Sequence, residues 1–456
     1  MIKKYLNRID NDFLSSVIKI KFVVLFPLFL LHTWSLQYLN GGLPFDFVSR
    51  LSFKIEDQPW LPGGRVAEPY FGRHFFGDLN LGIGYSTFSN PFDSSLTVPN
   101  QTPPLGTLFF RIFLILGVNN VLIVFLLINL IALLIIFYLA SNYRDLLRNN
   151  ALYILIVTTS FPLLFLIDRG AVHLIVISLI ICSLYFLSRS KHTLFLLTSI
   201  LACSIKPQSF VIIFLILVYF KKSRLLWSFI FLFLITNALA LHFFFEGSLL
   251  FKFKSYLFAS SFYSGGRGVG YVMDSTSLIG LISRIQEFFI GSELTSKNLL
   301  IFDKFFLVPG MLYVIGLLII LKSYKYSLWL TLGLILSTFS LVLPASMTYT
   351  LVWAIPALLL FSGTGPLVTQ FKHNFPFIET RSKNVNAIYF GAKAFYLLGL
   401  FYGLVFHLWS IRGPSGVERF PLGEVLNPMF LSITVFLLLV DLLKQKAFSK
   451  GRENVQ

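Results

Sequence analysis

Most of the chain consists of long apolar runs separated by short polar segments, a pattern that indicates membrane-spanning helices. A helix perpendicular to a bilayer needs roughly 20 apolar residues, and many runs come close to that length. The runs 193–205 and 207–220 are shorter, so we interpret them as half-inserted or as broken at Pro207. The pattern predicts an all-α polytopic membrane protein with about twelve transmembrane helices. The runs cover residues 22–39, 121–140, 151–167, 171–188, 193–205, 207–220, 225–245, 304–321, 327–343, 350–363, 387–410 and 427–443.

Two long segments interrupt the apolar runs. Segment 40–120 concentrates Gly, Pro, Asp, Asn and Ser, and segment 246–303 joins the seventh and eighth runs. Loops of this length are usually functional. Within the first, residues 103–117 could form a full span or a helix lying on the outer membrane surface. Arg111 lies in the middle of this stretch, and a crossing here would invert the charge pattern downstream, so we expect a juxtamembrane helix.

We expect one integral-membrane domain over residues 1–456, with no separate soluble domain. Its predicted parts are a first transmembrane helix (22–39), a first extracytoplasmic loop with a juxtamembrane helix (40–120), transmembrane helices 2–7 (121–245), a second large extracytoplasmic loop (246–303), transmembrane helices 8–12 (304–443) and a cytoplasmic tail (444–456).

The composition excludes an ordinary soluble protein. Hydrophobic residues make up 56% and charged residues 12% of the 456 residues, whereas a soluble domain carries about 25% charged residues. The 37 Lys and Arg against 20 Asp and Glu give a net charge of +17. We assign this excess to basic loops facing anionic lipid rather than to nucleic-acid binding. Cys182 and Cys203 both lie inside apolar runs and predict no disulfide framework.

The distribution of charge predicts which side of the membrane each segment faces. Lys3, Lys4 and Arg8 precede the run 22–39, and the cytoplasmic flanks of membrane helices are rich in Lys and Arg. No small-residue cleavage site follows this run, so we expect a retained anchor. With alternating crossings, more than half of the Lys and Arg are cytoplasmic and most of the Asp and Glu lie outside. We therefore expect a multi-pass protein of a bacterial cytoplasmic membrane with both termini in the cytoplasm.

Polar residues between the runs collect on the outer face in this topology. Asp168 and Arg169 could form a solvated turn, Lys206 could extend to the headgroups, and Arg267 in its Gly-rich segment could be a flexible loop tip. Alternatively, Gly265–Gly268 forms a nest of backbone N–H groups with a guanidinium, which suits a phosphate. Together these cations and an acidic loop suit a lipid-linked phosphate with a carboxylate nearby as base. A transporter built on inverted repeats would show two matching halves, which the sequence lacks.

The order of several short motifs resembles glycosyltransferase family 87 of the GT-C superfamily. The resemblance covers roughly residues 70–360, and the chain departs from the family pattern at His173, Met347, Tyr349 and Thr350. The motifs are Asp168-Arg169-Gly170-Ala171-Val172-His173-Leu174 followed by Ser204-Ile205-Lys206-Pro207; Asn90-Pro91-Phe92 followed by Thr102-Pro103-Pro104-Leu105; Asp274-Ser275-Thr276-Ser277-Leu278 with Arg284; and the segment 344–350 followed by Trp353 and Pro356.

The resemblance implies a GT-C-like helix bundle that acts as a glycosyltransferase at the outer membrane face. Such an enzyme moves a sugar, commonly mannose, from a polyprenyl-phosphate donor to a hydroxyl of a lipid or glycan acceptor, with a first-loop aspartate as base. Asp78 precedes Asn90 by the spacing that the family shows, so we choose it as the base. Asp57 and Asp46 are the alternatives, and Glu56 and Asp93 also compete.

The resemblance also implies roles for other residues. Arg169, Lys206 and Arg267 would bind the donor phosphate. The sugar pocket would contain His74, Asp168, His173 and Tyr349.

We expect no required cofactor. The sequence has no Cys/His metal cluster, no phosphate-binding P-loop and no dinucleotide motif; a divalent cation, Mg²⁺ or Mn²⁺, could assist the transfer. The expected partners are the lipid-linked donor, the acceptor and membrane lipids, without nucleic acid. The alternative function is a lipid or polysaccharide transporter, or a non-catalytic membrane subunit, in which the same cations guide an anionic lipid without sugar transfer.

Overall fold

The computed structural model of the chain describes residues 77–93, 100, 102–115, 118–140, 160, 162–163, 166–167, 170–262, 277–290, 308–323, 328–342, 348–361, 365–374, 387–405, 410–411 and 420–453.

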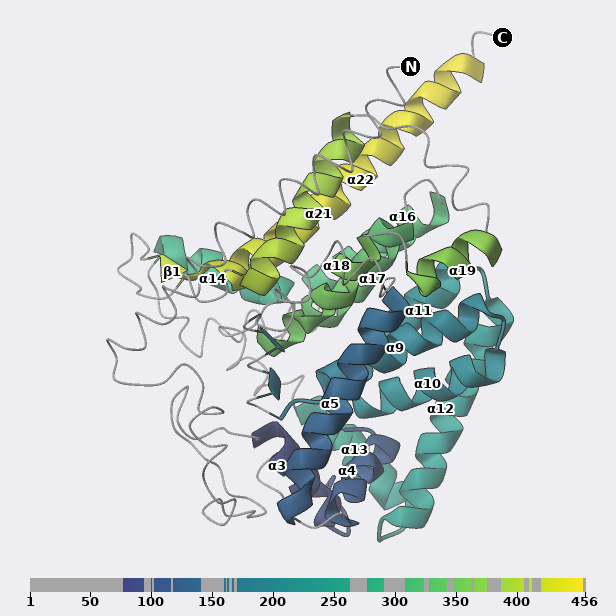
Figure 1. The fold of residues 1–456 in the computed structure, drawn as a ribbon, viewed down its shortest axis with the longest axis vertical. Coiled ribbons are helices and arrows are strands. Elements are labelled where there is room, and N and C mark those ends of the chain that lie inside the picture. Colours follow the sequence, from purple (N-terminus) through teal and green to yellow (C-terminus); the bar gives the residue numbers. More distant parts are fainter. Residues whose placement is uncertain are drawn as a thin grey trace.

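The described residues form helices almost throughout (Figure 1). Among them, one antiparallel pair of two-residue strands joins β1 (Ser410–Ile411) to β2 (Phe420–Pro421). The predicted all-α class is therefore correct for this part of the chain. The helices are α3 (Gly77–Thr87), α4 (Pro104–Ile115), α5 (Val118–Ala140), α9 (His173–Ser188), α10 (His192–Ile205), α11 (Ser209–Tyr219), α12 (Ser223–Phe244), α13 (Leu249–Phe262), α14 (Leu278–Ile290), α16 (Val308–Ser323), α17 (Leu328–Leu341), η4 (Thr348–Trp353), α18 (Ala354–Phe361), α19 (Pro366–Asn374), α21 (Ala387–Val405) and α22 (Leu422–Glu453).

Three of the described helices are long and apolar enough to cross a membrane. They are α5, α12 and α22, through the segments Ile123–Ala140, Ser223–Phe244 and Val425–Gln445. Only 17% of the α12 segment is buried in the protein. Its outward side chains include Trp227, which is 69% exposed, and Phe243, which is 71% exposed. Large aromatic side chains on so much of one helix match a hydrocarbon surrounding rather than water. The chain is a helical membrane protein.

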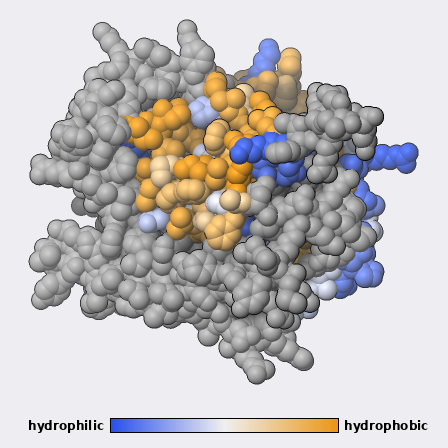
Figure 2. All heavy atoms as spheres, turned by 90° about the horizontal axis from the view of Figure 1, so that it is seen from above, coloured by the Kyte–Doolittle hydropathy of each residue, from blue (hydrophilic) through white to orange (hydrophobic). Residues whose placement is uncertain are grey.

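Apolar side chains also gather on the end of the molecule seen from above (Figure 2). They form one continuous area with hydrophilic residues at its edge. From this end the hairpin of α21 and α22 extends away from the other helices (Figure 1). Inside the hairpin the two helices approach closely, since Asn427 Nδ2 donates to Gly399 O at 2.7 Å. The absence of a side chain at Gly399 leaves room for this contact, and Leu431 also packs against it.

Helices α9 to α12 run back and forth as consecutive neighbours. The α9–α10 corner turns at Ser190 (φ 55°) and the α11–α12 corner turns at Lys221 (φ 53°). At the first corner Lys191 N–H donates to Phe186 O at 2.9 Å, and the second has the equivalent bond. This is the Schellman geometry, which normally places glycine at the left-handed position. Both corners lie at the same end of the hairpins and carry cationic residues.

A smaller layer of helices closes the opposite end of α12. It contains α3, α4 and α13 (Figure 1). Its core forms around Phe92, whose ring meets Phe245 edge to face at 5.3 Å and Tyr256 at 5.4 Å. Helix α3 packs on α4 at Gly82, where a Cβ atom would stand 2.6 Å from the Phe110 ring. Through α4, which packs against both α3 and α10, this layer connects the first turn of α3 with the end of α10.

Several predicted boundaries differ from the structure. The apolar runs near α5, α9 and α12 are helical close to the predicted limits, and α10 and α11 are separate helices that meet at Lys206 and Pro207. Helices α3, α13, α14 and α19 were not predicted, because each is short and mixes polar with apolar residues. Helix α22 continues to Glu453, beyond the end of its apolar run at 443, because helical hydrogen bonding does not need apolar side chains. The run 22–39 lies outside the described residues.

Candidate functional site

The candidate site lies where the ends of three helices meet. Asp78 is in the first turn of α3, His173 is the first residue of α9, and Lys206 follows the last residue of α10. The Asp78 carboxylate interacts electrostatically with Lys206, and the charge of Lys206 also acts on His173. Because such interactions weaken with distance, these three groups belong to one region of the fold despite their separation in the sequence. The structure thus brings together one carboxylate, one ammonium group and one imidazole.

Helix α3 presents Asp78 at its positive end. The helix begins at Gly77, and Asp78 is the acidic residue of its first turn. Unpaired backbone N–H groups and the helix dipole at this end stabilise a carboxylate. The Asp78 side chain is partly exposed, so it remains reachable.

Proline explains why Lys206 lies at a helix end. Lys206 has extended backbone angles (φ −138°, ψ 108°), and its N–H makes the last bond of α10, to Ala202 O at 2.9 Å. Pro207 lacks an N–H donor and disfavours the helical conformation of the preceding residue. Two buried polar atoms beside it, Gln208 Oε1 and Ser209 Oγ, have no hydrogen-bond partner within the structure. Buried polar groups normally have partners, so these atoms are candidates for ligand contacts.

Asn237 holds three helices together next to Lys206. From α12, its Oδ1 accepts a hydrogen bond from Leu105 N–H at 3.1 Å, in the first turn of α4. Its Nδ2 donates to Ser204 Oγ at 3.2 Å, near the end of α10, and to Phe233 O at 2.9 Å. Asn237 is 9% exposed. One buried amide therefore fixes the start of α4 and the end of α10 on α12.

Glycine permits α4 to cross α10 in direct main-chain contact. A Cβ atom at Gly106 would stand 1.9 Å from Ser204 O. No other residue type fits without a shift of one helix, because the clash involves backbone on the α10 side. The motif Thr102-Pro103-Pro104-Leu105 of the first loop thus meets the motif Ser204-Ile205-Lys206-Pro207 in space.

Two cations meet at the carboxyl end of α12. Arg111 Nη1 of α4 donates to Phe244 O at 3.3 Å, and its Nε donates to Ser86 O, at the carboxyl end of α3, at 2.8 Å. Lys252 Nζ of α13 donates to Phe245 O at 2.8 Å and to His242 O at 3.0 Å. The last carbonyls of a helix have no internal partners, and cations are favourable there. These contacts join α3, α4 and α13 to the end of α12.

The first-loop motif around Asn90 is a compact turn. Asn90 Oδ1 accepts from Phe92 N–H at 3.3 Å, and Pro91 O accepts from Asn100 N–H at 2.9 Å. Asn100 Nδ2 in turn donates to Thr107 Oγ1 at 2.8 Å. The asparagines of this segment therefore form hydrogen bonds with the local backbone and with α4.

The remaining predicted site residues are placed less completely. Tyr349 lies in η4, which packs against α9 and α17. Near the predicted turn at 168–170, Gly170 adopts φ 67° and its N–H donates to Ile167 O at 3.0 Å. The chain thus turns at this glycine before α9 begins. Asp46, Asp57, His74, Asp168, Arg169 and Arg267 lie outside the described residues.

The part of the chain that the structure describes contains no group of three or more His, Cys, Asp and Glu residues arranged to hold a metal ion. Among the described residues, Asp78, His173 and Lys206 are ionisable groups linked by electrostatic interactions at the candidate site.

Sequence reasoning missed the residues that position the site. Asn237 lies within an apolar run, where a lone polar residue is a signal for a buried contact. Arg111 was noted only for its effect on topology, and Lys252 was not singled out. Nothing in the local sequence says which carbonyls these side chains reach, because their partners come from other helices.

Comparison with known proteins gives no match to this chain, whether to a family model, to a curated protein or to a solved structure.

Proposed function

We propose that this chain is a GT-C type glycosyltransferase that moves a hexose such as mannose from a polyprenyl-phosphate donor to a hydroxyl of a lipid or glycan acceptor. The observation that carries the proposal is that the charge of Asp78 acts on Lys206, whose own charge acts on His173. A transfer from a lipid-linked phosphate needs one base for the acceptor and one cation for the leaving group. This pair supplies both at one helix junction. The order of motifs that resembles glycosyltransferase family 87, from which Asp78 and Lys206 were chosen, also supports the proposal.

In the proposed reaction the Asp78 carboxylate accepts the proton of the acceptor hydroxyl. The hydroxyl oxygen then bonds to the anomeric carbon of the sugar, and the bond from that carbon to the phosphate oxygen breaks. The electron pair leaves with the phosphate, whose negative charge the Lys206 ammonium neutralises. Ser209 Oγ, buried and without a partner within the structure, is available to donate to a phosphate oxygen. Water must be excluded for such charges to act strongly, and the apolar surroundings favour this.

The proposed topology places this junction within the outer half of the bilayer. Arg189, Lys191 and Lys221 mark the other end of α9 to α12, which becomes cytoplasmic by the positive-inside rule. Helix α10 has 14 residues, which corresponds to about 21 Å of helix, less than the roughly 30 Å of hydrocarbon. A recessed junction suits a donor that arrives in the membrane, since non-helical backbone at this depth must face protein or a polar cavity.

The full arrangement that we propose has about twelve transmembrane helices in a GT-C-like bundle. Both termini lie in the cytoplasm, and the loops 40–120 and 246–303 face the outside of a bacterial cytoplasmic membrane. In this arrangement Arg169 and Arg267 would join Lys206 at the donor phosphate, and His74, Asp168, His173 and Tyr349 would surround the sugar. Asp57 and Asp46 remain the alternative bases.

Sugar transfer by the purified protein tests the proposal. The protein in lipid nanodiscs is given synthetic polyprenyl-phosphate donors carrying labelled mannose or other hexoses, with glycolipid acceptors. The readouts are labelled acceptor and released polyprenyl phosphate. We expect transfer by the wild type, loss in Asp78→Asn, and retained transfer in Asp93→Asn. Asp93 is a matched control because it also belongs to the first loop but lies in the turn after Asn90.

The same assay separates the transferase from the alternative function. A transporter or non-catalytic subunit would bind or move the lipid-linked sugar without releasing polyprenyl phosphate. It would also be insensitive to Asp78→Asn. Donor binding without transfer from any donor in the panel would therefore overturn the proposed function.

A further inference from the structure

Helix α13 has its apolar side turned outward and its polar side turned inward. Lys252 is 2% exposed, Ser255 is 8% exposed and Ala259 is fully buried. In a water-soluble protein the charged face of such a helix would be outside. The outward side chains are Leu249 (48% exposed), Leu250 (64%), Phe251 (51%), Phe253 (50%), Leu257 (51%) and Phe258 (43%).

The orientation of α13 is fixed by Lys252. Its Nζ donates to Phe245 O at 2.8 Å and to His242 O at 3.0 Å. A rotation of α13 that hid the phenylalanines would remove both bonds and leave the carbonyls at the end of α12 without this partner. Phe92 and Tyr256 also pack together on the inner side, edge to face at 5.4 Å. The outward apolar face is therefore a consequence of how α13 is anchored.

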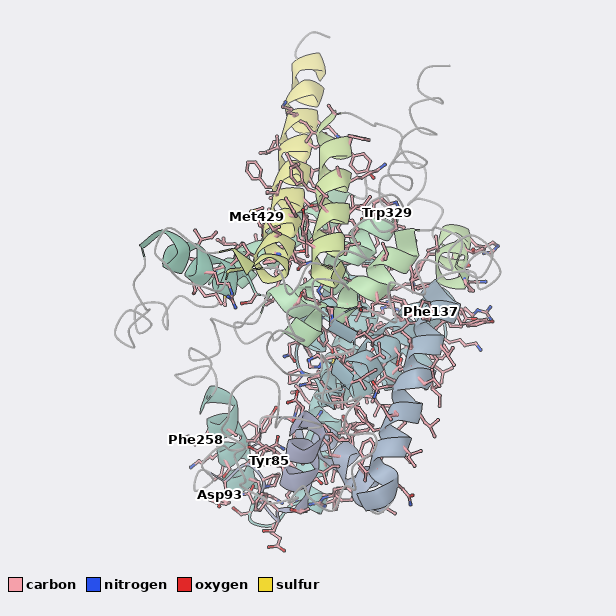
Figure 3. All side chains as sticks on the ribbon, turned by 60° about the vertical axis from the view of Figure 1, so that its left-hand side comes forward. Tyr85, Asp93, Phe137, Phe258, Trp329 and Met429 are labelled. Carbon is pink, nitrogen blue, oxygen red and sulfur yellow. The ribbon has the colours of Figure 1, made fainter. Side chains whose placement is uncertain are left out.

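The apolar face of α13 continues that of α12. Phe243 and Phe244, at the end of α12, are 71% and 55% exposed. Only a short turn at Gly247, with φ 102°, separates the two helices. Figure 3 shows Phe258 at the same end of the molecule as Tyr85 of α3 and Asp93. The exposed surface of α13 thus follows a candidate membrane span after a turn that carries the exposed polar residues Glu246 and Ser248.

We infer that α13 is embedded in the lipid bilayer, with its Leu and Phe side chains among the acyl chains, and is not part of a solvated loop. Lipid fits better than a second protein copy because similar apolar side chains also cover the outer sides of α5 and α12, which are candidate membrane spans. Lys254 is the charged residue on the exposed side of α13. A lysine on such a helix can extend to a lipid phosphate while its methylene groups stay among the chains. This inference does not depend on the proposed enzyme activity.

Fluorescence quenching from two sides tests this placement. The full chain, with both native cysteines changed to alanine, receives a single cysteine at position 250, 253 or 257 and a bimane label. It is reconstituted in vesicles of phosphatidylethanolamine and phosphatidylglycerol, with or without lipids that carry a quencher on the acyl chain. Phe231→Cys on α12, where the native side chain is 63% exposed, is the lipid control. Lys191→Cys at the exposed α9–α10 corner is the aqueous control.

We expect acyl-chain quenching at 250, 253 and 257 to be similar to that at 231 and at least about fivefold greater than at 191. Aqueous iodide should quench the label at 191 but hardly at the α13 positions. Iodide quenching at 253 and 257 equal to that at 191 would show a solvated helix and overturn the inference. Labels that neither quencher reaches would mean that protein covers α13, for example a second copy, and would overturn it as well.

Discussion

Gly106 of α4 lies directly against the main chain of Ser204, two residues before Lys206, so that a Cβ atom at position 106 would stand 1.9 Å from Ser204 O. This contact sets how closely the first-loop helices approach the end of α10. It therefore controls the distance between Lys206 and the carboxylate of α3.

Gly106→Ala should separate α4 from α10. Forced overpacking lowers the free energy of unfolding by about 1–3 kcal/mol. We expect a decrease near the larger of these values, because the added methyl group would clash with the backbone of α10. Sugar transfer should fall with it. Gly84→Ala on α3 is the control, since a Cβ atom at position 84 would meet nothing within 4 Å. Thermal unfolding in nanodiscs checks both variants, and equal midpoints would contradict the close contact.

Asn237→Ala should destabilise the protein far more than Asn129→Ala. Both asparagines are buried in helices and donate to the carbonyl four residues earlier, but Asn237 also binds Leu105 N–H and Ser204 Oγ. Loss of a partner for a buried polar group lowers the free energy of unfolding by about 1–3 kcal/mol. The comparison of the two melting midpoints decides whether the amide joins α4, α10 and α12. Similar losses in both variants would argue against that role.

Lys252→Met should loosen α13 from α12. The change keeps the length of the side chain but removes two donated hydrogen bonds. Each hydrogen bond to a charged group contributes about 1.5–3 kcal/mol to the free energy of unfolding, and the cost of burying the lysine charge offsets part of this gain. Lys254→Met, on the exposed side of the same helix, removes an equal charge without these bonds. Hydrogen exchange of residues 249–262 followed by mass spectrometry is the measurement. If exchange in residues 249–262 were accelerated equally in both variants, the result would contradict the anchoring of α13 by Lys252.

Ser190→Gly should stabilise the α9–α10 corner. Ser190 has φ 55°, a conformation that disfavours residues with a Cβ atom by about 1–2 kcal/mol. Glycine removes this strain, although part of the gain is lost to the greater freedom of the unfolded chain. Ser190→Ala keeps the strain and serves as the control. A melting midpoint that rises for neither variant would indicate that the corner has another conformation.

The helical class and the membrane character could be predicted from the sequence because they depend on local apolar runs. The break between α10 and α11 was also predictable, since Pro207 acts on its immediate neighbours. By contrast, α3 could not be recognised from its own residues. Its sequence Gly77–Thr87 contains three glycines and little periodic pattern, and its packing against α4 at Gly82 stabilises it instead.

The order of the motifs led us to expect Asp78 and Lys206 in one site, and in the structure the charge of Asp78 acts on Lys206. Their roles remain predictions. The residues that hold them there could not be named in advance, because the partners of Asn237 and Gly106 depend on how α4 crosses α10. Likewise, two lysines in 249–262 suggest a solvated segment, and only the fold reveals that Lys252 points inward to the end of α12.

A double-mutant cycle on Asp78 and Lys206 tests most directly whether they form one catalytic site. The rate of sugar transfer is measured for the wild type, Asp78→Asn, Lys206→Gln and the double variant. A general base contributes about 10²–10⁴-fold to the rate, so we expect a loss of at least about 100-fold in Asp78→Asn. The two residues act on the same transfer step, so the double variant should be little slower than the slower single variant. Full transfer in either single variant, or losses that simply multiply in the double variant, would contradict the account.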